Sequence, residues 1–269
     1  MPIEQSRAPQ SLGFLDLEFS GLSFEQVLET VAERADRPGF SYIVTPNVDH
    51  VVKLRAKTEH PSLQAFSDAY DAAALRLCDS RILAALAKPF GIILPVVPGS
   101  DLTAAIFRKL LVAGHRVAIV GGSADTTSRL GNLFPDIEFV QHIPPMGMLS
   151  NSAAMKAAEE FVNQCDAGFV LFATGAPQSE ILAHRCFIGG DAKGIGLCIG
   201  ASIEFLLGDQ RRAPQWMQRA GLEWVHRLAT NPRRLWRRYL VEGPRIFLIT
   251  AGWWWARHRT KGRMFGPGI

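Results

Sequence analysis

The feature that most constrains the fold of this chain is an alternation of short, apolar, β-branched runs with longer amphipathic segments. The runs predict strands over 42–45, 92–97, 116–120, 137–142, 167–174 and 194–199. The segments between them have apolar residues at helical spacing and predict helices over 23–34, 48–57, 61–75, 80–87, 102–113, 124–132, 150–164 and 179–187. Strands that alternate with helices in this way pair in parallel. We therefore expect an α/β fold with a mainly parallel sheet and helices on both faces.

The strand pattern ends near Gly208, and Arg and Trp become frequent after it. Residues 211–269 contain 13 Lys and Arg residues against two Asp and Glu residues, a net charge of +11, whereas residues 1–210 carry −7. Such a segment requires a polyanionic partner, for which nucleic acid, anionic phospholipid and a diphosphate group are the candidates. We expect two parts: a Rossmann-like α/β catalytic domain over 1–208 and a basic helical appendage over 209–269.

The most apolar run of the appendage, 246–256, is too short to cross a bilayer, which needs about 20 apolar residues. Its flanks, Arg245 and Arg257, and its three tryptophans at 253–255 are typical of a membrane-interface anchor. The alternative is a last helix packed on its own domain. Residues 1–13 contain no apolar stretch of the kind found in signal peptides, so the cytoplasm is the expected compartment.

The pattern of potential ligands indicates neither a metal nor a redox cofactor. The four cysteines are far apart and predict buried free thiols, the seven histidines lack metal-ligand spacing, and no Asp-x-Asp occurs. Gly121 and Gly122 end a strand and let backbone N–H groups approach a phosphate, unless they form a plain tight turn. The G-x-G-x-x-G motif is incomplete, which disfavours a nicotinamide-dependent dehydrogenase.

In a parallel sheet, ligands bind beyond the carboxyl ends of the strands. Thr45 and Asn47 follow one predicted strand, where they can hydrogen-bond a sugar or simply form a turn. Asp79 follows a short apolar run, as a general base or as the N-cap of the next helix. Asp101 has the same two possible roles, with capping favoured. Gly200 allows a second close backbone approach.

Arginines of the appendage are the candidates for neutralising a diphosphate. Arg227, Arg234 and Arg238 are spaced by seven and four residues, so they share one helix face if the helix continues through Pro232 with a kink. Arg237 lies next to that face. A solvated basic face is the alternative.

Five sequence blocks together carry a family resemblance: Thr45-Pro-Asn47, Pro98-Gly-Ser-Asp101-Leu, Val120-Gly-Gly122, Gly175-Ala-Pro177 with Glu180, and RAPQWMQRAGLEW over 212–224. On these blocks the chain resembles the WecG/TagA/CpsF glycosyltransferases, family 26, over roughly residues 12 to 245. The resemblance implies metal-independent, inverting transfer of a sugar from a UDP-sugar to a polyprenyl-diphosphate-linked sugar. It also implies a homo-oligomer, peripheral on the cytoplasmic face of a bacterial inner membrane, that binds no nucleic acid.

The resemblance also implies roles for individual residues. The base falls on Asp79, and the diphosphate-binding arginines fall on Arg227, Arg234 and Arg237. The substrate-binding positions fall on Thr45, Asn47, Gly121, Gly122, Gly175, Pro177, Gln178, Glu180, Gly200 and Glu204. The chain has Asp79-Ser80 where the family commonly has Asp-Gly, Ser179 where it commonly has Gln, and Glu204 where it often has Asp.

The donor sugar is expected to be of the glucose or N-acetylmannosamine type. The segments Pro-Asn-Val-Asp-His over 46–50 and Cys-Asp-Ser over 78–80 are similar to those of a branch that makes xanthan-like exopolysaccharides, in which glucose is transferred. The alternative function is a non-catalytic nucleotide-binding or membrane-scaffold subunit of a polysaccharide assembly complex.

Overall fold

A six-stranded parallel sheet lies at the centre of the computed structural model, which describes residues 11–56 and 60–263. Its strand order is β4-β3-β8-β7-β5-β6, and every neighbouring pair is parallel. The strands are β3 Phe40–Val44, β4 Leu75–Arg76, β5 Arg116–Gly121, β6 Glu138–His142, β7 Phe169–Ala173 and β8 Gly194–Cys198. The expected α/β fold with a mainly parallel sheet is confirmed.

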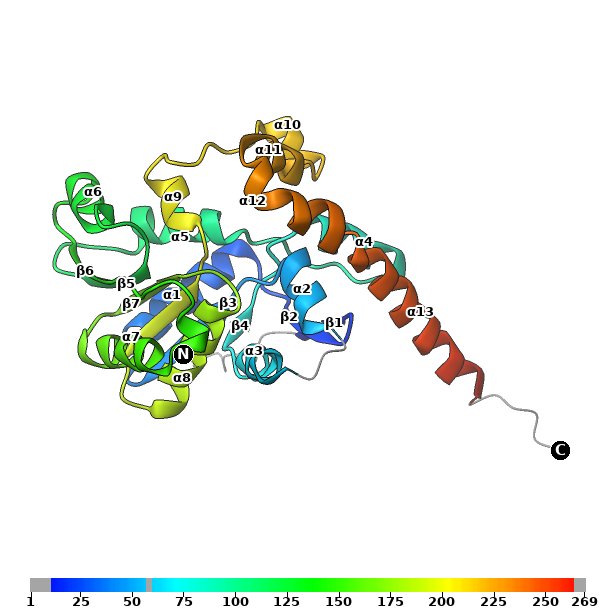
Figure 1. Ribbon diagram of the computed structural model, residues 1–269, viewed down its shortest axis with the longest axis horizontal. Helices are drawn as coiled ribbons and strands as arrows, with labels where there is room; N and C mark the ends of the chain where they lie inside the picture. The colour runs from blue at the N-terminus through cyan, green and yellow to red at the C-terminus, as the bar shows by residue number, and fades with distance from the viewer. Residues whose placement is uncertain (1–10, 57–59, 264–269) are drawn as a thin grey trace, which may run out of the picture.

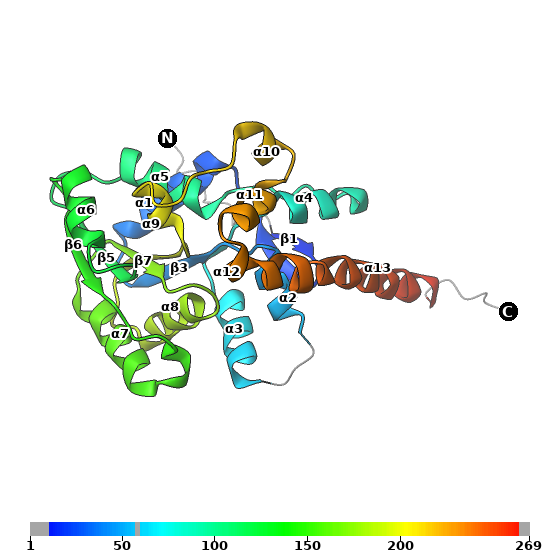
Figure 2. The same cartoon turned by 45° about the horizontal axis from the view of Figure 1, so that its top comes forward.

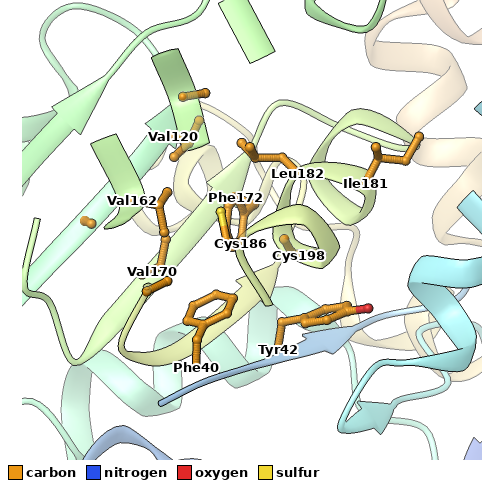
Figure 3. Close-up of a cluster of buried hydrophobic side chains, with 14 of the residues drawn as sticks. Phe40, Tyr42, Val120, Val162, Val170, Phe172, Ile181, Leu182, Cys186 and Cys198 are labelled. Carbon is orange, nitrogen blue, oxygen red and sulfur yellow. The ribbon is translucent and has the colours of Figure 1, made fainter. Parts of the chain in front are cut away.

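Helices cover both faces of this sheet (Figure 1). One face packs against α3 Pro61–Asp71, α7 Ser152–Gln164 and α8 Gln178–Gly189, and Figure 3 shows part of this core around Phe40, Tyr42 and Phe172. The other face packs against α1 Phe24–Ala35, α5 Gly99–Lys109 and α6 Thr126–Leu133. Because both faces are covered, the strands read as nearly continuous apolar runs in the sequence.

The run 92–97 does not form a strand, contrary to expectation. Pro95 has no N–H to donate to a strand ladder, and the side chain of Ile93 is 78% exposed. Val96 makes only an isolated parallel bridge to Cys78, just beyond the two-residue strand β4. The expected helix over 48–57 is α2 Val48–Leu54, and Lys57 lies outside the described residues.

An N-terminal hairpin that the sequence pattern does not indicate packs beside the sheet. Strands β1 Ser11–Phe14 and β2 Leu17–Ser20 pair in antiparallel fashion around Leu15 and Asp16, which both have positive φ angles. Two-residue hairpin turns of the commonest type need this conformation. The hairpin forms a third core with α2, α4 Arg81–Ala87 and the start of α13 Arg245–Arg263.

The described part of the chain after β8 contains only helices, as expected. These are α9 Ser202–Leu206, α10 Gln215–Arg219, α11 Glu223–Thr230, α12 Pro232–Trp236, a π-helical turn Arg237–Glu242 and α13. The helix is interrupted at Asn231, so no single helix runs through Pro232. The four elements from α10 to the π-helical turn contain no buried residue.

Helix α13 projects from the body of the molecule on the same side as α4 (Figure 2). On one face, Ile246, Ile249 and Trp253 pack into the third core. Leu248 and Trp255 on other faces are 76% and 57% exposed. Helix α13 therefore packs on the body of the protein through one face and exposes apolar side chains on others, and the membrane-interface anchor stays a prediction. Within the described residues, no helix is both long and apolar enough to cross a membrane.

Candidate active site

A cavity of about 810 Å³ opens at the carboxyl ends of β3, β4, β7 and β8. The loops after these strands form one side of it, and residues from α10 to the π-helical turn form the other, which we call the roof. The cavity brings together many of the residues expected from the sequence, namely Thr45, Asn47, Asp79, Asp101, Gly175, Glu180, Gly200, Glu204, Arg227 and Arg234.

The loop after β3 holds Thr45 and Asn47 by hydrogen bonds within the protein. The Thr45 hydroxyl donates to the carbonyl of Cys198 at 3.0 Å, which ties the ends of β3 and β8 together. The Asn47 side-chain oxygen accepts from the backbone N–H groups of Asp49 and His50 and caps α2. Both residues line the cavity, so each combines a structural role with a position from which it can reach a ligand.

Asp79 lies in the loop after β4, half-buried in the cavity wall. Burial raises the pKa of its carboxyl from 3.8 to about 7. Arg227 in the roof lowers this pKa, whereas the carboxylates of Glu223 and Asp101 raise it further. A carboxyl group with a pKa near neutrality can accept a proton during a reaction at physiological pH.

The capping roles considered for Asp79 and Asp101 are wrong. Ser80 is the N-cap of α4, since its hydroxyl accepts the N–H of Leu83 at 3.2 Å. Helix α5 begins at Gly99 without a side-chain cap. Asp101 lies inside its first turn and forms an ion pair with Arg212 from the segment before α10. Both residues line the cavity, and neither caps a helix.

Glu180 is a buried acid at the start of α8, with only 2% of its surface exposed. Burial raises the pKa of its carboxyl to about 7, although a hydrogen bond from its own backbone N–H acts in the opposite direction and lowers the pKa. Its Oε2 atom has no hydrogen-bond partner within the protein, although the residue lines the cavity. Such a group is poised to bind a ligand, because an unpaired buried polar atom is costly.

Four expected substrate-binding residues do not line the cavity, namely Gly121, Gly122, Pro177 and Gln178. Gly121 has a packing reason to be glycine: its φ is +102°, and a Cβ there would lie 2.9 Å from the carbonyl of Ala173. Gly122 also has a positive φ, of +80°, and a Cβ there would lie 2.9 Å from the hydroxyl oxygen of Thr126. The paired glycines therefore fit the plain-turn alternative. Glu204 does line the cavity and accepts a hydrogen bond from the side chain of Gln210.

Arg227, Arg234 and Arg238 line the cavity, whereas the exposed Arg237 does not. The seven-and-four spacing therefore selects the cavity-facing set, although the helix is broken between its members. The guanidinium of Arg227 lies 5.0 Å from the centre of the Phe205 ring. The family resemblance gave the diphosphate-binding role to Arg237, but the neighbouring Arg238 is the residue that lines the cavity.

Asp49 and Lys53 on α2 are further cavity residues that the sequence did not single out. Asp49 lies 2.9 Å from Lys53 and 3.4 Å from Arg238, so it connects the body of the protein to the roof. Burial disfavours ionisation of Asp49, but Arg238 and Lys53 together lower its pKa. The i, i+4 spacing of Asp49 and Lys53 on a predicted helix could have indicated their ion pair. The pairing of Asp49 with Arg238 could not be predicted, because Arg238 lies on a distant segment.

The remaining charged residues of the cavity mix both signs. Basic side chains come from Arg81, Arg211 and Arg212, and acidic ones from Glu223 and Glu242. Among the residues that the structure describes, no three His, Cys, Asp or Glu side chains are arranged to hold a metal ion. A carboxyl of near-neutral pKa facing several guanidinium groups can deprotonate a hydroxyl while a neighbouring anionic group is neutralised.

These features belong to a glycosyltransferase: residues 12–260 match the model of the "Glycosyl transferase WecG/TagA/CpsF family", and the chain is a member of that family. The predicted resemblance is confirmed. The chain is also similar to an N-acetylglucosaminyldiphosphoundecaprenol N-acetyl-beta-D-mannosaminyltransferase from Bacillus spizizenii. The two are 29% identical over 242 residues, which cover 88% of this chain and 87% of the relative.

Proposed function

We propose that this glycosyltransferase moves a hexose-type sugar from a UDP-sugar to a sugar linked to polyprenyl diphosphate, with inversion and without a metal ion. The observation that carries the proposal is the placement of Asp79 beneath Arg227, Arg234 and Arg238 in one cavity. The Bacillus relative is named for the same kind of acceptor, a sugar on diphosphoundecaprenol. The product is a precursor of a cell-envelope or exopolysaccharide polymer.

Asp79 acts as the general base in this proposal. Its carboxylate removes the proton of the acceptor hydroxyl as the oxygen attacks the anomeric carbon, and the bond from that carbon to UDP breaks. A pKa near 7 leaves a large fraction of Asp79 ionised at neutral pH and still basic enough to accept the proton. Inversion follows because the hydroxyl attacks the face of the sugar opposite to the leaving diphosphate.

The roof arginines supply the positive charge for two diphosphates, that of the departing UDP and that of the lipid acceptor. Arg227 and Arg234 have no acidic partner within 4 Å among the described residues, whereas Arg238 pairs with Asp49. Guanidinium groups bind phosphate oxygens strongly and carry the charge that a divalent cation would otherwise supply. We therefore assign this role to Arg227, Arg234 and Arg238.

The division of the chain near Gly208 has a functional meaning in this proposal. Residues 1–208 carry the base, and residues 209–269 carry the roof and α13, whose exposed Leu248 and Trp255 contact the cytoplasmic face of the inner membrane. Basic side chains of the same segment attract anionic lipids. We also propose a homo-oligomer, on the family resemblance, which light scattering tests.

The donor remains either of two kinds in this proposal. The activity for which the Bacillus relative is named favours N-acetylmannosamine, and the segments 46–50 and 78–80 favour glucose. Purified protein incubated with each UDP-sugar and a lipid-diphosphate sugar acceptor decides between them by the mass of the product. Absence of any transfer from either donor would favour the alternative of a non-catalytic subunit.

The role of Asp79 is tested by Asp79→Asn, which keeps the shape of the side chain but cannot accept a proton. We expect kcat to fall by about 10²–10⁴-fold. The matched control is Asp191→Asn, an exposed carboxylate outside the cavity, which should leave kcat unchanged. In the wild type, kcat/KM should rise with pH through an apparent pKa near 7 as Asp79 ionises. Near-normal turnover by a folded Asp79→Asn protein would remove Asp79 from the mechanism.

A further inference from the structure

An apolar groove of about 290 Å³ lies between α13 and the α4 region, outside the catalytic cavity. Leu86 and Phe90 form one wall. The other wall is a stripe along α13, made of Phe247, Thr250, Ala251 and Trp254. These four positions follow the pattern i, i+3, i+4 and i+7, so they lie on one face of the helix.

This stripe is only partly covered by the protein. Ile246, Ile249 and Trp253 on the neighbouring face of α13 are packed into the third core. In contrast, the side chains of Phe247 and Trp254 are 58% and 40% exposed. Exposed apolar side chains that border a groove commonly mark a binding site.

The groove adjoins the catalytic cavity, because Phe247 lines both. From Phe247 the stripe runs along α13 to Trp254, away from the roof, over about 10 Å at the rise of an α-helix. The cavity at its near end holds Arg81, Arg234 and Arg238. A ligand that fits both parts has an anionic head and an apolar chain attached directly to it.

We propose that this groove binds the first isoprene units of the polyprenyl diphosphate acceptor, next to the diphosphate. This assignment rests on the proposed function for the acceptor and adds a site for its lipid chain. A cavity of about 150 Å³ holds a six-carbon ring, so about 290 Å³ corresponds to roughly two five-carbon isoprene units. The remainder of the chain continues beyond Trp254 toward the lipid.

The proposal predicts that a prenyl group strengthens the binding of a diphosphate in the absence of any membrane. Farnesyl diphosphate, a short prenyl diphosphate, and inorganic pyrophosphate are titrated into the full-length protein by calorimetry. We expect farnesyl diphosphate to bind about 10- to 30-fold more tightly than pyrophosphate, from the burial of a few methylene-sized groups. Equal affinities for the two compounds would overturn the proposal.

A substitution that fills the groove should remove this preference. In Ala251→Phe, a ring on the exposed stripe occupies the space between α13 and Phe90, and the affinity ratio should fall below about threefold with the pyrophosphate affinity unchanged. The matched control is Leu248→Phe, which places a ring on α13 outside the groove and should retain the wild-type ratio. An unchanged ratio in Ala251→Phe would refute the site.

Two further outcomes are distinguished by the same proteins. Weaker binding of Ala251→Phe to phosphatidylglycerol vesicles, with the affinity ratio unchanged, would mean that membrane acyl chains occupy the groove and would overturn the proposal. Failure of the proposed function appears separately, as absence of sugar transfer to any acceptor, because the binding ratio does not depend on turnover. Ala251→Phe should also keep wild-type turnover on an acceptor that lacks the prenyl chain.

Discussion

The protonation of Glu180 gives a prediction about stability that is independent of the enzyme's substrates. Its pKa is raised from 4.5 to about 7 by burial in the folded protein, whereas the unfolded chain returns it to the ordinary value. The folded state therefore binds more protons than the unfolded state between these two values. The stabilisation from protonated Glu180 is complete below about pH 4.5 and is lost as pH rises through 7.

The size of this effect follows from the two pKa values. Each pKa unit corresponds to about 1.4 kcal/mol, so ionised Glu180 costs the folded state about 3 kcal/mol at pH 8. At pH 5 the same group costs about 1 kcal/mol, because the unfolded chain is already mostly ionised. Glu180→Gln removes the ionisation. Its free energy of unfolding, relative to that of wild type, should therefore improve by about 2 kcal/mol between pH 5 and pH 8.

Urea denaturation of both proteins at the two pH values measures this difference. The amide introduced by Glu180→Gln adds an N–H group near the unpartnered Oε2 position, which costs about 1–3 kcal/mol, but the cost is the same at both pH values and cancels. Glu29→Gln, an exposed control that keeps Glu180, should follow the stability of wild type at both pH values. A relative stability of Glu180→Gln that does not change between pH 5 and pH 8 would refute the reasoning.

Three other predictions concern activity and membrane binding. Transfer should persist in excess EDTA because arginines neutralise the diphosphates, and loss on chelation with recovery on adding magnesium would contradict this. Arg238→Gln should reduce kcat/KM by at least 10-fold, whereas Arg237→Gln, outside the cavity, should change it by less than about twofold in the same assay. The double variant Leu248→Ser and Trp255→Ser should sediment less with anionic vesicles than wild type, and equal sedimentation would exclude α13 as the anchor.

The sequence predicts the sheet well because its central strands are buried on both faces, which leaves uninterrupted apolar runs. The same criterion fails at 92–97, where Pro95 prevents pairing of an equally apolar run. The hairpin escapes detection because Leu15 and Asp16 occupy turn positions that usually hold Asn and Gly. Leu15 is nevertheless buried, with 1% of its surface exposed, and that packing offsets its unfavourable backbone conformation.

The cavity residues that follow strand ends could be predicted from the sequence, whereas the ion pairs between distant segments could not. Thr45, Asn47 and Asp79 were found because parallel strands end at one edge of a sheet. The ion pair of Asp49 with Arg238 joins residues almost two hundred positions apart, and no local pattern announces it. This ion pair depends on how the roof folds back over the body of the protein. The spacing of residues within one helix does not determine that arrangement.

The roof of the cavity is attached to the body in an unusual way, since its helices α10 to α12 and the π-helical turn contain no buried side chain. Ion pairs hold it and the segment leading to it instead, from Asp49 to Arg238, from Asp101 to Arg212 and from Arg129 to Asp209. Attachments of this kind weaken with ionic strength, whereas the apolar core does not. Amide hydrogen exchange should therefore be fastest over 209–242 and accelerate there with added salt, long before the sheet opens. The position of the roof over the cavity should therefore depend on the ionic strength of the surrounding solution.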